Sequence, residues 1–168
     1  MSVTITFLGG ADTVTGSKYL VRHEKQCLLV DCGLFQGYKQ LRLRNWNPLP
    51  VAPDQIDAVV LTHAHLDHSG YLPLLANEGF RGKVHATKGT QLLCRILLPD
   101  SGHLQEEDAA YANRHSTSKH SPALPLYTRQ DALNCQNLIK AHPFGQVFEP
   151  IPGWRVSFTQ AGHILGAS

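Results

Sequence analysis

The sequence predicts a protein of the α/β (α+β) class, and three features lead to that prediction. Two short runs, Cys27–Val30 and Ala58–Leu61, are apolar at every position, which is typical of strands that are covered on both faces. Segments with helical spacing alternate with the strands along the chain. Hydrophobic residues make up 42% of the 168 residues and the net charge is only +2, which excludes a disordered chain.

The first third of the chain is expected to be β-structure. Val3, Ile5 and Phe7 alternate with threonines, which predicts a half-buried strand. After a glycine-rich loop, further strands are expected at Ser17–Arg22 and Cys27–Val30.

An irregular stretch then leads to the second buried strand. Gln36–Trp46 is compatible with a short helix or an extended loop, and three prolines between residues 48 and 53 enforce an irregular connection. The strand Ala58–Leu61 follows and runs directly into a cluster of histidines.

The second half is expected to be mainly helical, with a break at Pro99 and Gly102. Thr128 with Asp131 three residues later forms a capping-box pattern, which predicts a helix start. The expected elements are helices over His68–Asn77, Gly89–Leu98, Gln105–Arg114 and Thr128–Ala141, and strands over Lys83–Ala86 and Trp154–Ala161.

Histidine is unusually frequent, with ten in the chain, and three of them fall within six residues. The pattern is His63-x-His65-x-Asp67-His68, directly after a predicted strand. In extended backbone, residues two apart point to the same side, so His63 and His65 can bind one metal ion together. Asp67 and His68, in the first turn of a helix, point elsewhere and suit a second ion. The alternative is that these four residues are solvated loop residues without a metal. Four possible metal ligands within six residues make that alternative the weaker one.

Motifs along the whole chain resemble the N-terminal part of the metallo-β-lactamase fold, and more closely its RNA-processing branch, the β-CASP metallo-hydrolases. The His-x-His-x-Asp-His loop alone marks only the superfamily, whereas the opening loop, the Asp-Cys-Gly-x-Phe-Gln-Gly run and the final Ala-Gly-His-Ile-Leu-Gly point to that branch. The matching stretches are Phe7–Gly10, Val14–Ser17, Leu29–Gly33, Phe35–Gly37, His63–Gly70 and Ala161–Gly166.

The resemblance implies an αββα sandwich, of which residues 1–168 would form the N-terminal portion, the first half of the fold. It implies that Asp31 supports the metal loop and that His163 joins His63 and His65 on a first zinc ion. Asp67 would hold the attacking hydroxide and, with His68, ligate a second zinc. The family's later aspartate and histidine ligands and its β-CASP insertion have no match here, so the second zinc site is expected to be incomplete.

The full-length parent would then be a zinc-dependent ribonuclease acting on single-stranded RNA, with Asp67 and Asp31 as its catalytic residues. This chain would be a weakly active or inactive form of it. Two alternatives remain open: a thioester, lactam or lactone hydrolase of the same fold, and a non-catalytic zinc-binding or scaffolding module. An uncovered half of a sandwich would also make the chain prone to form a homo-oligomer.

The remaining features suggest structural roles. Four cysteines without Cys-x-x-Cys spacing are expected to be core residues, which favours a reducing, cytoplasmic setting, and no apolar run is long enough to span a membrane. The other histidines default to surface or core positions. The basic and aromatic stretch Tyr38–Trp46 could contact nucleic acid, although a solvated face is the simpler interpretation.

Overall fold

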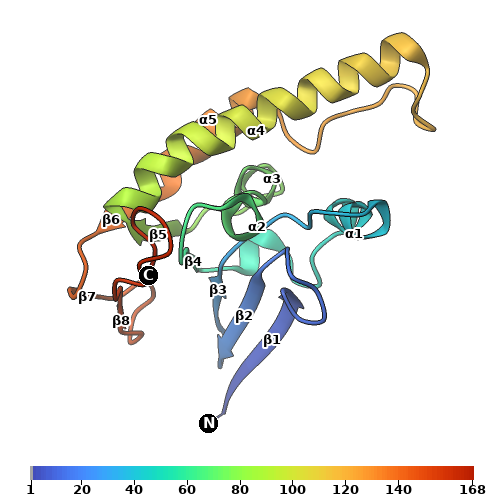
Figure 1. The fold of residues 1–168 in the computed structure, drawn as a ribbon. Helices are drawn as coiled ribbons and strands as arrows, with labels where there is room; N and C mark the ends of the chain where they lie inside the picture. The colour runs from blue at the N-terminus through green and yellow to red at the C-terminus, as the bar shows by residue number, and fades with distance from the viewer. Residues whose placement is uncertain (1) are drawn as a thin grey trace.

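The computed structural model describes residues 2–168 and confirms the α/β class, with one six-stranded sheet in the order β1-β2-β3-β4-β5-β6 (Figure 1). The strands β1 to β3 are antiparallel, whereas β3 to β6 run parallel. The strands are β1 (Val3–Gly9), β2 (Lys18–His23), β3 (Gln26–Val30), β4 (Ala58–Val60), β5 (Lys83–Thr87) and β6 (Ile139–His142), with a separate hairpin of β7 (Val147–Phe148) and β8 (Val156–Ser157).

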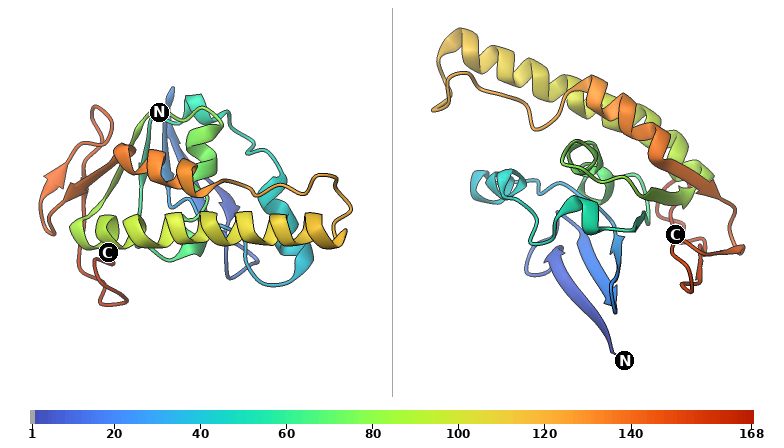
Figure 2. Two further views of the ribbon diagram at one scale, coloured as in Figure 1. Left: turned by 90° about the horizontal axis from the view of Figure 1, so that it is seen from above. Right: turned by 180° about the vertical axis from the view of Figure 1, so that it is seen from behind.

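Helices cover one face of the sheet, and Figure 2 shows α5 lying alongside the first part of the long helix α4. The α-helices are α1 (Lys39–Leu43), α2 (Leu66–Ser69), α3 (Leu72–Asn77), α4 (Lys88–His115) and α5 (Arg129–Cys135), and three short 3-10 helices are Arg44–Trp46, Pro53–Gln55 and Gln136–Leu138. Within residues 2–168, no helix combines the length and the apolar character needed to cross a bilayer.

The main core lies between the sheet and these helices, and it confirms the two buried strands. Leu29 of β3 and Val59 of β4 are fully buried there, beside Leu75 of α3 and Leu98 of α4. All four cysteines are buried and none forms a disulfide, as expected for small core residues.

The predicted break in the long helix is wrong, because α4 runs without interruption from Lys88 to His115. Pro99 removes one backbone donor, yet both Pro99 and Gly102 are buried. A Cβ on Gly102 would lie 2.7 Å from the backbone nitrogen of Arg129, so the glycine allows α5 to approach closely instead of ending α4. Tertiary packing overrides the local signal here.

Three further boundaries differ from expectation. The helix expected over His68–Asn77 is two helices, α2 and α3, separated at Gly70 and Tyr71. The capping box at Thr128 is confirmed, but α5 ends at Cys135, and Ile139–His142 instead pairs with β5 as an edge strand. Of the strand expected at Trp154–Ala161, only Val156–Ser157 forms one.

The first strand is present, but it is not half-buried. The side chains of Val3, Ile5 and Phe7 are 60%, 58% and 63% exposed. Ile5 lies opposite Val21 of β2, on the sheet face away from the main core. The hairpin β7–β8 and the loops around it cover this second face near β3 to β6, where Leu28 packs in a small cluster and Phe148 stacks on His85 and His142. An apolar strip along β1 is therefore open to solvent.

We expect this open strip to drive concentration-dependent association of residues 1–168, because exposed apolar patches and unpaired strand edges favour contacts between copies. Light scattering across a wide concentration range measures the effect. The double variant Ile5→Thr/Phe7→Thr should reduce it. Val14→Thr, at a loop position that is 94% exposed, is the matched control and should not. A monomer at all concentrations would contradict the expectation.

Two of the histidines that were expected at surface or core positions form a buried pair. His85 Nδ1 lies 2.8 Å from His142 Nε2, and both rings stack on Phe148. The two residues are 57 positions apart and are brought together because β5 and β6 are neighbours. Burial, together with the charges of His142 and Lys140, lowers the pKa of His85 to about 4. Burial also lowers the pKa of His142.

The free energy of unfolding should therefore fall as the pH drops from about 6.5 toward 4. Over that range the unfolded chain binds a proton at His85 that the folded chain does not. The free energy of unfolding then falls by about 1.4 kcal/mol for each pH unit and each such proton. Urea unfolding of the metal-free chain at several pH values measures this slope. His85→Phe keeps an aromatic ring in the stack and should flatten the slope. An unchanged slope in that variant would rule out His85 as a source.

Candidate metal centre

The site lies at the carboxyl edge of the parallel strands, where α/β sheets usually bind ligands. Asp31 directly follows β3, and the segment from Thr62 to His68 begins two residues after β4 ends. The backbone N–H of Asp31 donates to the carbonyl of Val60 at 2.9 Å, so the two strand ends are joined. A Cβ on Gly33 would lie 1.6 Å from the carbonyl oxygen of Asp67, so only glycine permits this close docking of the histidine loop.

Three histidines converge at this edge. His63 Nε2 lies 3.1 Å from His65 Nδ1, and His163 Nε2 lies 3.2 Å from the same atom. His63 is buried, whereas His163 is exposed. His163 comes from the loop after β8, 98 positions beyond His65. Sequence spacing alone places the first two together, and the fold adds the third.

These three nitrogens fit a zinc ion. Ligand nitrogens at about 2.0–2.1 Å from a tetrahedral zinc are themselves about 3.3 Å apart, close to the separations found between the histidines. Among residues 2–168, they are the only group of three or more metal-type ligands whose donor atoms lie within 4.8 Å of one another. The cluster could therefore hold one metal ion, and three protein ligands leave the fourth position of a tetrahedral zinc for water.

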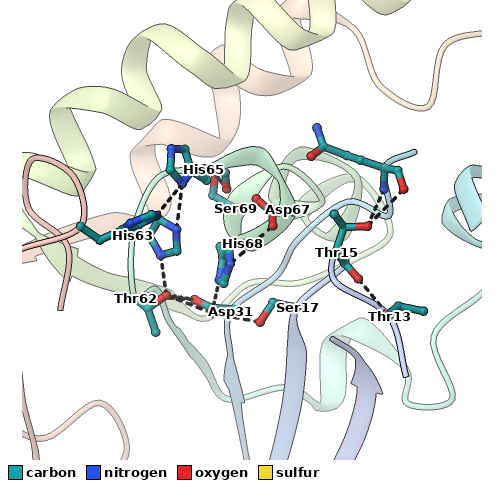
Figure 3. Close-up of polar contacts among 12 residues, drawn as sticks. Thr13, Thr15, Ser17, Asp31, Thr62, His63, His65, Asp67, His68 and Ser69 are labelled. Atoms are coloured by element: carbon teal, nitrogen blue, oxygen red, sulfur yellow. Dashed lines mark hydrogen bonds and ion pairs between the residues drawn. The ribbon is translucent and has the colours of Figure 1, made fainter. Parts of the chain in front are cut away.

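Asp31 lies beneath the histidine loop and holds it by several hydrogen bonds (Figure 3). Its Oδ1 accepts from the backbone N–H of Thr62 at 2.8 Å and from its hydroxyl at 2.9 Å. Its Oδ2 accepts from His68 Nδ1 at 2.7 Å and from the hydroxyl of Ser17 at 3.2 Å. The residue is 2% exposed and has a φ of 59°, a left-handed conformation that aspartate tolerates better than most residues. Asp31 thus contacts the loop and not the three-histidine cluster.

The hydrogen bonds around Asp31 also set the histidine tautomers. A carboxylate only accepts hydrogen bonds, so His68 Nδ1 carries a proton. The other ring nitrogen, Nε2, is then the atom of His68 that can bind a metal. The Thr62 hydroxyl donates to Asp31, so it accepts from His63 Nδ1 at 3.0 Å. His63 Nε2 is then unprotonated and faces the cluster. Such outer contacts orient the imidazoles that bind metals in proteins.

Asp67 and His68 form a smaller second set beside the cluster. His68 Nε2 lies 3.6 Å from Asp67 Oδ2, and both side chains are partly exposed. In the part of the chain that the structure describes, no third ligand joins them. A second metal ion would have two protein donors here, fewer than zinc usually takes.

The pKa values of His63 and His68 are shifted in opposite directions. Burial lowers the pKa of His63 to about 4, helped by the neighbouring histidines, so this imidazole is neutral at pH 7 and ready to bind a metal. Burial alone would also lower the pKa of His68, but the hydrogen bond and charge of Asp31, and the charge of Asp67, outweigh it and raise the pKa.

Thr62 and Ser17 complete the hydrogen bonds of Asp31 and are not among the site residues predicted from the sequence. Thr62 stands at the end of a buried strand and next to His63, and Ser17 begins the predicted second strand. A polar side chain at the end of a buried strand is the signal that could have drawn attention to Thr62.

The fold and the three-histidine centre together define a metallo-hydrolase type of domain, and the chain belongs to the metallo-beta-lactamase superfamily, whose family model matches residues 12–129. The particular relatives are RNA-processing proteins of the β-CASP branch, as the motifs predicted. The chain is 35% identical over 160 residues to Ribonuclease TTHA0252 of Thermus thermophilus, which covers 95% of this chain and 32% of that protein.

Other relatives share the same stretch. Transcription termination factor FttA of Methanosarcina mazei is 32% identical over 171 residues, covering 99% of this chain and 24% of that protein. Endoribonuclease YSH1 of Gibberella zeae is 30% identical over 166 residues, covering 96% of this chain and 18% of that protein. The chain thus spans about a third or less of the length of these relatives.

Solved structures of metallo-β-lactamases share the fold. Subclass B3 enzyme MEM-A1, from a soil metagenome library, matches with a TM-score of 0.54 and 18% identity, covering 99% of this chain and 52% of that one. The metallo-beta-lactamase SMB-1 matches with a TM-score of 0.56 and 17% identity, covering 97% of this chain and 52% of that one. The expected fold is confirmed, and the chain corresponds to about half of such a domain.

Proposed function

We propose that residues 1–168 are the metal-binding part of a zinc-dependent RNA phosphodiesterase. The observation that carries the proposal is the convergence of three histidine nitrogens at the carboxyl edge of the sheet. It is supported by similarity, over 95% of the chain, to a protein named as a ribonuclease. Four buried, unpaired cysteines fit a cytoplasmic setting.

Each residue of the site has a distinct part in this proposal. His63, His65 and His163 hold the zinc, and Asp31 fixes the loop that carries the first two. A bound zinc ion supplies Lewis-acid chemistry and lowers the pKa of its water toward about 7. Asp67 and His68 lie beside the three histidines, where they would orient a water molecule and a phosphate of single-stranded RNA.

Metal analysis tests the first part of the proposal. After dialysis the chain should retain about one zinc, because one set has three donors and the other has two. His63→Ala should lose it, whereas His103→Ala, at an exposed position of α4 away from the site, is the matched control. Two zinc ions retained by the parent chain would contradict the predicted difference between the sets.

A second candidate function is a zinc-binding or scaffolding module without catalysis of its own. The observation that favours it is the pair of donors at Asp67 and His68, to which nothing else in residues 2–168 adds a ligand. Zinc binding without any RNA cleavage that depends on Asp67 would support this candidate.

A further inference from the structure

Hydrogen bonds attach the loop that carries His163 to the rest of the protein at two points, and Ile164 also packs against the main core. At its end, the backbone N–H and the hydroxyl of Ser168 both donate to the carbonyl of Thr62, at 3.0 and 3.2 Å. Before that, the carbonyl of Gly166 accepts two hydrogen bonds, from the hydroxyls of Thr87 at 2.6 Å and Thr90 at 3.0 Å. His163 itself is exposed, so its own packing contributes little to its position.

The contact at Gly166 is a close approach of two backbones. Gly166 has a φ of 81°, and a Cβ there would lie 2.3 Å from the nitrogen of Thr90. A Cβ on Gly89 would lie 2.8 Å from Cα of Gly166. Both positions therefore require glycine, and the loop is seated directly on the junction between β5 and α4.

Thr87 and Thr90 are both buried, at 1% and 0% exposed, although they are polar. Thr87 is the N-cap of α4, since its hydroxyl accepts from the N–H of Thr90 at 3.2 Å. A cap needs only that acceptor. The donor side of both hydroxyls is directed at one carbonyl, that of Gly166, three positions from His163.

We infer that Thr87 and Thr90 are positioning residues for the third metal ligand: through the Gly166 carbonyl they hold His163 within reach of His63 and His65. The inference rests on the proposed metal site. Without these two hydrogen bonds the loop would keep its attachment through Ser168 and the packing of Ile164 against the main core, but lose its hydrogen-bonded contact three residues after His163. Residues that orient a metal ligand from outside typically change metal affinity by about 10- to 100-fold.

The test uses the double variant Thr87→Val/Thr90→Val, which keeps the side-chain shape and removes both hydroxyls. Zinc affinity, measured by competition with a chromophoric chelator, should fall about 10- to 100-fold. Thr87→Ser/Thr90→Ser retains the hydroxyls and should restore it. Thr128→Val removes the N-cap of α5 instead, and is the matched control for a lost cap that does not touch the loop.

Two further measurements separate positioning from loss of stability. His163→Ala should weaken zinc binding much less in the Val/Val background than in the parent, because the histidine is already displaced there. In the metal-free chain, the amides of Ala167 and Ser168 should exchange with solvent faster in the double variant, since both are hydrogen-bonded next to Gly166.

The outcomes are distinct. Parental zinc affinity and parental amide exchange in the double variant would overturn the inference while the metal site stood. If the unsubstituted residues 1–168 bind no zinc, or bind it independently of His63, the proposed function is overturned as well. Equal losses in the double variant and in Thr128→Val would show that only helix capping matters, and would also overturn the inference.

Discussion

Residues 1–168 are expected to cleave single-stranded RNA many orders of magnitude more slowly than the full-length Thermus thermophilus ribonuclease to which they are similar. A two-metal phosphodiesterase holds its ions about 3.5–4 Å apart and uses both to clamp the attacking and leaving oxygens. Here one set has three converging donors, but the second has only Asp67 and His68. Poor positioning of substrate and nucleophile alone can cost several orders of magnitude in rate.

The cleavage rates of both proteins are measured on the same labelled single-stranded RNA under the same conditions, with zinc present. Asp67→Ala in this chain is the control for cleavage by the proposed site, and its trace activity should disappear. If the unsubstituted residues 1–168 cleaved RNA at a rate comparable to that of the Thermus thermophilus ribonuclease, and Asp67→Ala abolished this cleavage, residues 1–168 would already contain a complete catalytic site. Cleavage of a thioester or a lactam in place of RNA would favour the hydrolase alternatives of the same fold.

Asp31→Ala should have the largest effect on stability, about 3–5 kcal/mol less free energy of unfolding, the usual cost of removing one partner from a buried charged network. Its loss leaves the N–H and hydroxyl of Thr62 and the ring of His68 without their acceptor. Alanine is also strained at a φ of 59°. Against a typical total of about 5–15 kcal/mol, part of the population would unfold.

Asp31→Asn separates the charge from the conformation. Asparagine tolerates the left-handed backbone and still accepts through one oxygen, so its stability should lie between parent and Asp31→Ala. Its zinc affinity should nevertheless be about 10- to 100-fold lower, because an amide NH2 in place of Oδ2 cannot accept from His68 Nδ1 and the histidine loop loses part of its anchor. Urea denaturation and chelator competition give the two values. A loss of less than about 1 kcal/mol in Asp31→Ala would argue against the anchoring role.

The parts of the fold that were predictable from sequence depend on local patterns. The apolar runs predicted β3 and β4, Thr128 with Asp131 predicted the start of α5, and the histidine spacing predicted that the side chains of His63 and His65 lie together. Each of these signals is contained within a few neighbouring residues, so distant packing does not change it.

The parts that were not predictable depend on contacts between distant segments. Ile139–His142 has no strong strand pattern and becomes a strand because β5 offers an edge. Pro99 would end an isolated helix, but α5 packs against this stretch and α4 continues. His85 and His142 meet only because of strand order and register. His163 was assigned through its resemblance to a family motif, since nothing in its own neighbourhood marks it as a ligand.

The distance along the chain between the histidines has a consequence for folding. His63 and His65 are near neighbours and could capture an ion in the unfolded chain, but His163, 98 positions after His65, arrives only when β5, α4 and β6 are in place. Under the proposed function, zinc would therefore prefer the folded state and shift the folding equilibrium by mass action, by about 2.7 kcal/mol at a hundredfold excess over its dissociation constant. The ion would act as a reversible cross-link that closes a long loop, so the fraction of folded molecules would follow the supply of free zinc.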